Sequence, residues 1–238
     1  MQNDPMANPY GLDALWAAGD LVARGTLLIL VLMSVATWYV LVIKLIEQSR
    51  LLRQAKAADA RFWQSVSLSE GVNVLAAGSA FRLIAATGLH AARHHEGMTE
   101  EPVDLHTWVG LSMQRTVNEL VWALQDGLAV LATVGSTAPF VGLFGTVWGI
   151  YHALTAIGIA GQASIDKVAG PVGEALIMTA LGLAVAVPAV LGYNWLVRRN
   201  KMAIDRIRTF ASDVHSVLLS GGRAKTLGHA VARKALGA

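Results

Sequence analysis

The chain has 238 residues, of which 54% are hydrophobic and only 15% are charged, and it contains no cysteine. Disulfides, free thiols and cysteine-type metal sites are therefore excluded. The formal net charge is +3, and the excess comes from the C-terminal residues. These residues show neither a set of aromatics among the basic residues nor the recognisable module of a nucleic-acid-binding protein, so anionic membrane lipid explains them more simply and no nucleic-acid partner is expected.

Three uncharged stretches are long enough to cross a bilayer, which requires about 20 residues of helix. They cover residues 25–43, 127–165 and 175–197, with 19, 39 and 23 residues. The first is not a signal peptide, because three aspartates and only one basic residue, Arg24, precede it. We therefore predict an all-α polytopic membrane protein with three transmembrane helices, two of them long and extending into a cytoplasmic helical bundle.

The first predicted segments are an N-terminal periplasmic segment (1–24), transmembrane helix 1 (25–43) and a cytoplasmic insertion (44–126) with eight basic and nine acidic residues. Apolar residues at helical spacing between Trp108 and Leu128 predict one helix that continues unbroken into the second span. A break is expected instead at residues 96–104, where glycine, proline and four acids gather.

The 39-residue stretch exceeds one span but is short for two. We predict transmembrane helix 2 over 127–156, a periplasmic turn over 157–172 and transmembrane helix 3 over 173–197. A cytoplasmic amphipathic helix is expected over 198–220, because an apolar stripe recurs there at steps of three and four, and this stripe needs a packing partner. Residues 221–238 form a basic tail.

Basic residues determine the predicted orientation. Five follow the first span within residues 44–61 and five follow the third within residues 198–208, while the link between spans two and three has only Lys167. Because basic residues favour the cytoplasmic side, we expect the N-terminus outside and the C-terminus inside.

Small residues crowd the second span, and such residues allow membrane helices to approach closely. Two interpretations stay open: packing within one three-helix subunit, or packing of several copies around a central space. Prolines in these spans remove a backbone donor and are expected to kink their helices. The predicted packing or kink positions are Pro139, Gly142, Gly145 and Pro188.

Glu174 is the one charged residue in 170–197. A charge at the bilayer centre costs about 2.5–3.5 kcal/mol, so an acid in a span is a functional-site hypothesis. If Tyr193 and Trp195 mark the inner interface, Glu174 lies about 28 Å above Tyr193, near the outer edge of a core about 30 Å thick. There a glutamate can simply snorkel or interact with the positive end of its helix.

The neighbours of Glu174, residues 168–173, supply no other polar side chain. Such surroundings disfavour an ionised carboxyl and suit it to accept and release protons. Thr146 and Thr179 lie at similar heights on antiparallel helices, each about 29 Å from the charge at its inner end, and would support water or relay a proton. For either threonine alone, a bond to the carbonyl four residues back is the simpler interpretation.

No pattern indicates an enzyme, and we expect no cofactor and no metal site. His90 and His94 have the i, i+4 spacing of metal ligands, but no third ligand accompanies them, so a solvated face is the simpler interpretation. The segment "GLFGTVWG" lacks the lysine of a phosphate-binding loop. For His152, near the outer end of span two, an interfacial role is the default.

The segments "STAPFVGLFGTVWGI" (136–150) and "AGPVGEALIMTALGLAVAVPAVLGYN" (169–194) resemble the proton-channel family of ExbB, TolQ and MotA. The match covers both long helices and the topology agrees, whereas elsewhere the resemblance rests on layout alone. It implies an inner-membrane energy-transducing channel in which Glu174 is similar to the family's pore carboxylate and Thr146 and Thr179 to its pore-lining threonines. It also implies that the bilayer lies further toward the outer end of the long helices than the aromatic residues indicate.

The resemblance further implies partners. In that family several copies form a ring around the single spans of a smaller ExbD-like partner, which carries a membrane-embedded aspartate. Proton passage past that aspartate would move the partner and deliver force to a TonB-like periplasm-spanning protein.

Three spans argue against the MotA branch, which has four. The segments "GQASIDKVAGPVGEAL" and "LGYNWLVRRNK" resemble the ExbB branch, which energises TonB-dependent import. The TolQ branch, which acts in the envelope, and a non-conducting membrane scaffold remain alternatives.

Overall fold

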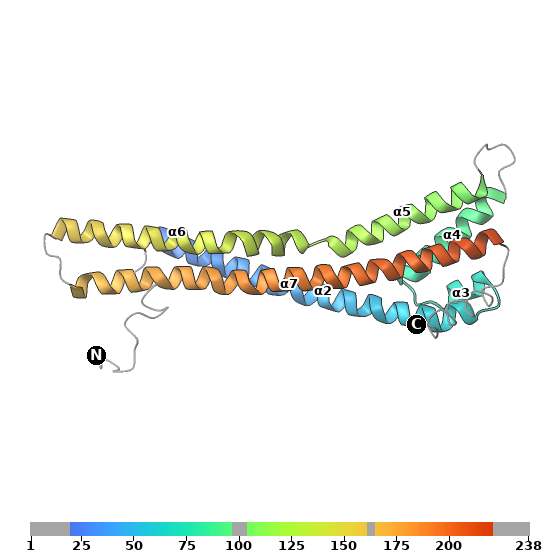
Figure 1. The fold of residues 1–238 in the computed structure, drawn as a ribbon, viewed down its shortest axis with the longest axis horizontal. Helices are drawn as coiled ribbons and strands as arrows, with labels where there is room; N and C mark the ends of the chain where they lie inside the picture. Colours follow the sequence, from blue (N-terminus) through green and yellow to red (C-terminus); the bar gives the residue numbers. More distant parts are fainter. Residues whose placement is uncertain (1–19, 97–103, 161–164, 221–238) are drawn as a thin grey trace. The chain divides into compact units, whose positions relative to one another are not determined.

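The computed structural model describes residues 20–96, 104–160 and 165–220, and for residues 95, 96, 156, 160, 165–171 and 174 it describes the backbone alone. The elements in these ranges are all helical (Figure 1): α2 (Leu21–Arg61), the 3-10 helix η1 (Phe62–Gln64), α3 (Leu68–Val74), α4 (Ala80–Glu96), α5 (Leu105–Gln125), α6 (Leu128–Ala160) and α7 (Ile165–Ser220). Three helical regions are long and apolar enough to cross a membrane. The prediction of an all-α protein with three spans is therefore confirmed.

The described residues divide into two compact units. The first, here the membrane unit, comprises the described residues of 1–42 and 127–195, and the second, the insertion unit, those of 43–126 and 196–238. α2 and α7 are each one helix that contributes to both units. That α2 runs to Arg61, well past the predicted span 25–43, was not predicted from the sequence.

The membrane unit has a core of small and branched apolar side chains from α2, α6 and α7. Its buried members include Leu30 on α2, Ala138 on α6 and Ala189 on α7. Large apolar side chains such as Phe140 and Leu191 remain exposed on the outside of these helices, as expected for a surface that contacts lipid. The two prolines predicted as packing or kink positions do not interrupt the helices: α6 continues through Pro139 and α7 through Pro188.

The bounds of the turn predicted over 157–172 are wrong. α6 continues to Ala160 and α7 begins at Ile165, so most of the predicted turn is helical, while residues 161–164 lie outside the described residues. The turn was placed on small residues such as Gly158. A glycine inside a helix costs only about 1 kcal/mol relative to alanine, so an isolated glycine does not end a helix.

The prediction of one unbroken helix from the insertion into the second span is also wrong. α5 ends at Gln125 and α6 begins only at Leu128. Asp126 has a ψ of 141°, and Gly127 has a φ of 77°, a left-handed conformation that glycine adopts without strain. The apolar spacing does not reveal this break, because it continues in helical steps on both sides of the two residues.

Side chains from two other helices cap the C-terminus of α5. The last carbonyls of a helix have no partner within it. Lys44 of α2 donates its Nζ–H to the carbonyl of Ala123 at 3.0 Å, and Asn200 of α7 donates its Nδ2–H to the carbonyl of Leu124 at 2.7 Å. Gln48 donates to Asn200 Oδ1 at 2.5 Å, so a buried polar network holds this end of α5 in the insertion unit.

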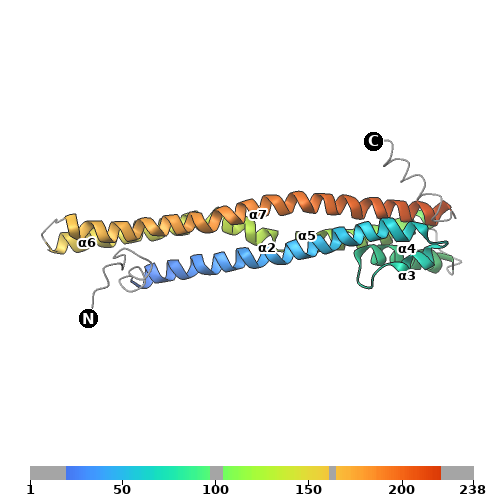
Figure 2. The same cartoon turned by 90° about the horizontal axis from the view of Figure 1, so that it is seen from below.

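The core of the insertion unit is built around aromatic residues. Phe210 of α7 lies with its ring centroid 5.0 Å from that of Phe62 and 5.1 Å from that of Phe81. Ile207 and Val214 of α7 are buried in the same cluster, so the predicted apolar stripe has its packing partner. Both views show α3 and α4 beside the C-terminal parts of α2 and α7 (Figures 1 and 2).

Candidate functional site

Two glycines bring α6 and α7 into backbone contact in the membrane unit. A Cβ atom on Gly142 would lie 2.6 Å from the carbonyl oxygen of Met178, and one on Gly182 would lie 2.7 Å from that of Ala138. Distances this short are essentially never seen for real Cβ atoms. Neither helix can therefore carry a side chain at these positions without moving away from the other.

Further small residues extend this contact, the α6–α7 seam, in both directions. A Cβ atom on Gly145 would lie 3.2 Å from the Cβ of Met178, and one on Gly149 would lie 3.0 Å from the Cβ of Ala175. Gly145 would also approach Thr26 of α2 at 3.1 Å. These contacts support packing within one subunit for the glycines concerned, which is the first of the two interpretations that the sequence left open.

Thr146 lies inside the seam and bonds to both helices. Its side chain is buried, and its Oγ1 lies 3.1 Å from the carbonyl oxygen of Gly142 and 2.9 Å from that of Ala175. It also forms a hydrogen bond with the half-buried hydroxyl of Thr179. The structure therefore brings together the two threonines that the sequence placed at similar heights.

The proton count of these hydroxyls restricts how they bond. A threonine hydroxyl has one hydrogen to donate and two lone pairs. Because both carbonyls near Thr146 only accept, Thr146 donates to one of them when Thr179 donates to Thr146. In that arrangement the two hydroxyls form a short hydrogen-bonded chain that ends on a helix carbonyl.

Glu174 belongs to α7, and its side chain lies outside the described residues. Its backbone immediately precedes Ala175, whose carbonyl oxygen lies 2.9 Å from Thr146 Oγ1. The adjacent Gly173 borders open space, since a Cβ atom there would meet nothing within 4 Å. Contact between the carboxyl of Glu174 and the threonines stays a prediction.

A second polar cluster of the membrane unit was missed by the sequence analysis. Asp20 accepts a hydrogen bond from Trp148 Nε1–H at 2.6 Å, and the same carboxylate oxygen lies 3.7 Å from His152 Nε2. Its other oxygen accepts from the backbone N–H of Ala23 at 2.8 Å and so caps the start of α2. An aspartate before an apolar run signals such a cap, but no sequence pattern links it to α6.

Hydrogen bonds hold Asp20 in its ionised form. The Ala23 backbone N–H and, after it, the Trp148 indole N–H lower the pKa of Asp20, and His152 adds a smaller charge effect in the same direction. Asp20 thus connects the start of α2 to α6 with a negative charge.

Over residues 80–209 the sequence matches the MotA/TolQ/ExbB proton channel family. The chain belongs to this family. The matched residues include the whole α6–α7 seam with Thr146, Glu174 and Thr179. With three helices that could span a membrane, the chain is a multi-pass membrane protein of a proton-channel family. This family is not a known class of enzymes.

Curated relatives from both the ExbB and TolQ branches resemble the chain. "Biopolymer transport protein ExbB" of Xanthomonas campestris pv. campestris is 42% identical over 217 residues, which cover 87% of this chain and 86% of the relative. The protein of the same name from Neisseria meningitidis is 36% identical and covers 88% of this chain and 97% of its own. "Tol-Pal system protein TolQ" of Pseudomonas aeruginosa is 33% identical, with coverages of 86% and 91%.

The histidines of the insertion unit form no metal centre in the part of the chain that the structure describes. No group of three or more His, Cys, Asp or Glu residues there is placed to hold a metal ion. His90 and His94 have ring centroids 6.1 Å apart on one face of α4, so they are neighbours as their spacing predicts, without a third ligand among the described residues.

Proposed function

We propose that this chain is the ring-forming subunit of an inner-membrane proton channel that works with an ExbD-like single-span partner. The complex would convert proton motive force into mechanical energy for TonB-dependent import across the outer membrane. Two observations support the ExbB branch: relatives named ExbB are 42% and 36% identical, against 33% for a TolQ. The TolQ-like function in the Tol-Pal system is the second candidate, because the TolQ match also covers most of the chain.

The observation that carries the proposal is the position of the two hydroxyls beside the backbone of α7. Thr146 bonds to Thr179 and contacts the carbonyl of Ala175, the residue that follows Glu174. In this proposal the carboxyl of Glu174 takes up a proton from the outer side. The hydroxyls of Thr146 and Thr179 then extend a hydrogen-bonded path from Glu174 toward the inner side. The membrane-embedded aspartate of the partner then receives the proton and passes it on.

The glycine contacts give this arrangement its rigidity. Because the backbones of α6 and α7 touch at Gly142 and Gly182, the two threonines are held at a fixed separation. Polar groups act on a moving proton only when they are held in position before it arrives. The remaining faces of the ring-forming helices would contact neighbouring copies, the partner span and lipid.

The proposed orientation places the N-terminus in the periplasm and the C-terminus in the cytoplasm of a bacterial inner membrane. It rests on the ten basic residues that follow spans one and three, against Lys167 alone in the link between spans two and three. In this orientation Asp20 and His152 lie on the periplasmic side and the insertion unit on the cytoplasmic side.

The test is complementation in the host. The gene is deleted and restored as wild type, Glu174→Ala or Glu174→Asp at matched membrane levels, and growth on a chelated iron source and sensitivity to detergent are measured. We expect wild type to restore iron-dependent growth and Glu174→Ala to restore none. Glu174→Asp should restore intermediate growth, because aspartate keeps the carboxylate on a side chain that is one methylene shorter. Glu119→Ala removes an exposed glutamate of α5 and is the matched control.

The outcomes separate the alternatives. If the deletion leaves iron uptake intact and makes the envelope sensitive to detergent, the TolQ-like function replaces the ExbB-like one. If Glu174→Ala assembles and restores growth fully, the chain is a scaffold and the proton pathway through Glu174 is refuted.

A further inference from the structure

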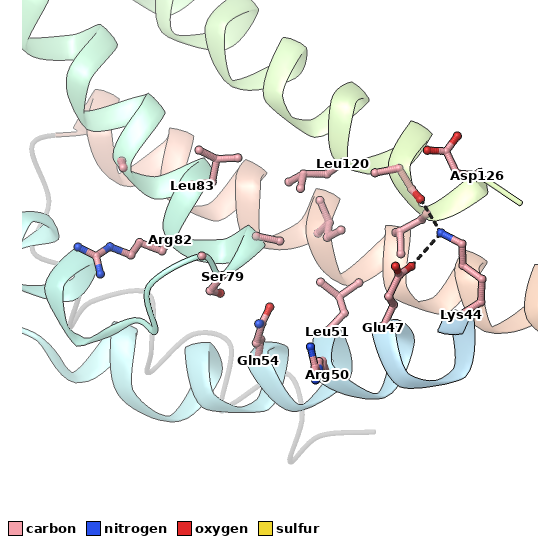
Figure 3. Close-up of a pocket in the computed structure, with 16 residues that line it drawn as sticks. Lys44, Glu47, Arg50, Leu51, Gln54, Ser79, Arg82, Leu83, Leu120 and Asp126 are labelled. Carbon is pink, nitrogen blue, oxygen red and sulfur yellow. Dashed lines mark hydrogen bonds and ion pairs between the residues drawn. The ribbon is translucent and has the colours of Figure 1, made fainter. Parts of the chain in front are cut away.

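A pocket of about 780 Å³ lies in the insertion unit between α2, α4, α5 and α7 (Figure 3). Its wall is mainly aliphatic, with Leu51 of α2, Leu83 of α4 and Leu120 of α5 among the side chains that line it. Its volume lies within the range of small-molecule sites, about 300–1,000 Å³. Such a wall suits a hydrocarbon chain rather than a polar solute.

The rim of the pocket is charged, with an excess of basic groups. Lys44 and Glu47 pair at 2.8 Å and neutralise one another. Arg50 of α2 and Arg82 of α4 also line the pocket, and neither forms an ion pair with a carboxylate among the described residues. Against these two guanidinium groups stands only the carboxylate of Asp126, so the rim retains a positive charge.

Two residues that line this pocket border the uncharged stretches in the sequence. Lys44 is the first charged residue after the uncharged stretch 25–43, and Asp126 is the last charged residue before the stretch 127–165. Two chain segments that leave the apolar stretches therefore both contribute to the same pocket. In the proposed orientation these two residues lie at the cytoplasmic ends of the spans, and basic pockets on the cytoplasmic side of membrane proteins bind anionic head groups.

We propose that this pocket binds one anionic phospholipid, with its phosphate held by Arg50 and Arg82 and an acyl chain against Leu51, Leu83 and Leu120. Guanidinium groups bind phosphate oxygens with paired, charge-assisted hydrogen bonds. The bound lipid would join α2 to α4 within the insertion unit. This inference rests on the orientation given under the proposed function and not on proton conduction, so loss of proton flux and loss of lipid binding are distinguishable.

Native mass spectrometry of the purified full-length chain tests the proposal, with phosphatidylglycerol and phosphatidylcholine of identical acyl chains as probes. We expect the phosphatidylglycerol adduct to be several-fold more abundant than the phosphatidylcholine adduct. In Arg50→Gln/Arg82→Gln this preference should be lost. Arg53→Gln/Arg93→Gln removes two exposed arginines of the same helices that do not line the pocket, and it should keep the preference.

Ala86→Phe gives a second test, because Ala86 lines the pocket and a phenyl ring there would fill it without changing a charge. We expect this variant to lose the phosphatidylglycerol adduct. An equal preference for phosphatidylglycerol over phosphatidylcholine in the two double-arginine variants would overturn the proposal. A phosphatidylglycerol adduct as abundant in Ala86→Phe as in wild type would also overturn it. Displacement of the adduct by inorganic phosphate at moderate concentration would also overturn it, because the pocket would then hold a free anion rather than a lipid.

Discussion

The hydroxyl of Thr146 contacts backbone carbonyls of two helices. Its buried side chain contacts carbonyls of both α6 and α7 and bonds to Thr179. Thr137, on the same helix, is exposed, and among the described residues it bonds only to the carbonyl of Thr133, four residues back. The two threonines form a matched pair for measuring what the contact across the seam contributes.

We predict that Thr146→Val lowers the free energy of unfolding by about 1 kcal/mol, the net contribution of a typical intramolecular hydrogen bond. Thr137→Val should change it much less, because only a local, solvent-exposed bond is lost. Thermal unfolding of both variants in the same detergent measures the difference. Equal unfolding temperatures for the two would show that the bonds of Thr146 across the seam contribute no stability.

Asp20 gives a prediction about pH. Because its pKa in the folded protein is lowered from the usual 3.8, its charge contributes stability above pH 3.8, and this stability is lost as the pH falls through the folded value. Asp20→Asn retains a capping side chain but removes the charge. We expect it to lower the unfolding temperature at pH 7, with the difference from wild type shrinking below pH 3.8.

The control is Trp148→Phe, which removes the indole donor and keeps an aromatic ring. It should reproduce part of the decrease in unfolding temperature that Asp20→Asn causes at pH 7. The decrease in the double variant should be smaller than the sum of the decreases in the two single variants. A difference between Asp20→Asn and wild type that does not vary with pH would contradict this role of the charge.

Sequence reasoning reached part of the site. Thr146 and Thr179 were placed at one height by counting residues along two antiparallel helices, and the structure confirms that they meet. Asp20 with Trp148, and Lys44 with Ala123, were not found, because each pair joins residues far apart in the chain whose contact depends on helix rotation. The depth of Glu174 in the bilayer and its role stay predictions.

At the scale of the helix, the α6–α7 seam depends on glycines. Gly142 and Gly158 are both in α6, but a Cβ atom on Gly142 would lie 2.6 Å from the Met178 carbonyl oxygen, whereas one on Gly158 would meet nothing within 4 Å. Small residues in membrane helices allow such close approach. The same residue type is thus required at one position and dispensable at the other.

We predict that Gly142→Ala destabilises the protein by about 1–3 kcal/mol, the usual cost of inserting a methyl group into a packed core. Gly158→Ala should be neutral or stabilising by up to about 1 kcal/mol, because alanine has the higher helix propensity. Unfolding temperatures in detergent compare the two. Similar values for both variants would mean that the helices separate at no cost.

The end of α5 depends on side chains from other helices. Asn200→Ala removes the side chain that donates to the carbonyl of Leu124, and it leaves the Gln48 amide with the carbonyl of Leu196 as its remaining acceptor. An unsatisfied buried polar group costs about 1–3 kcal/mol. Asn194→Ala, which removes an exposed bond to the carbonyl of Val190, is the control. We expect only Asn200→Ala to speed proteolysis near residues 126 and 127, and equal rates in both variants would contradict the capping role.

The helices themselves were predictable where composition decides them. Uncharged stretches indicated three spans, and Ser220 ends α7 where the apolar stripe stops. The break at Gly127 and the continuation of α6 to Ala160 were not predictable, because an apolar pattern shows which face is buried and not whether the backbone continues. A two-residue break with a left-handed glycine leaves that pattern intact.

At the scale of the whole molecule, the apolar residues serve two environments. The aromatic cluster around Phe210 gives the insertion unit its own core, whereas the membrane unit has a core of small side chains and exposes its large ones. This division suits a family in which spanning helices contact other helices and lipid. In the proposed function, Glu174, whose backbone on α7 precedes Ala175, connects this architecture to proton transfer.

The most direct test of that connection is proton flux in liposomes that contain the purified chain together with the proposed single-span partner. An imposed pH gradient drives the flux, and a pH-sensitive dye inside the liposomes reports it for wild type, Glu174→Gln and the control Glu119→Gln. We predict that wild type and Glu119→Gln conduct equally, while Glu174→Gln forms the same complex and conducts no more than empty liposomes. Equal flux through wild type and an intact Glu174→Gln complex would contradict a proton pathway through Glu174.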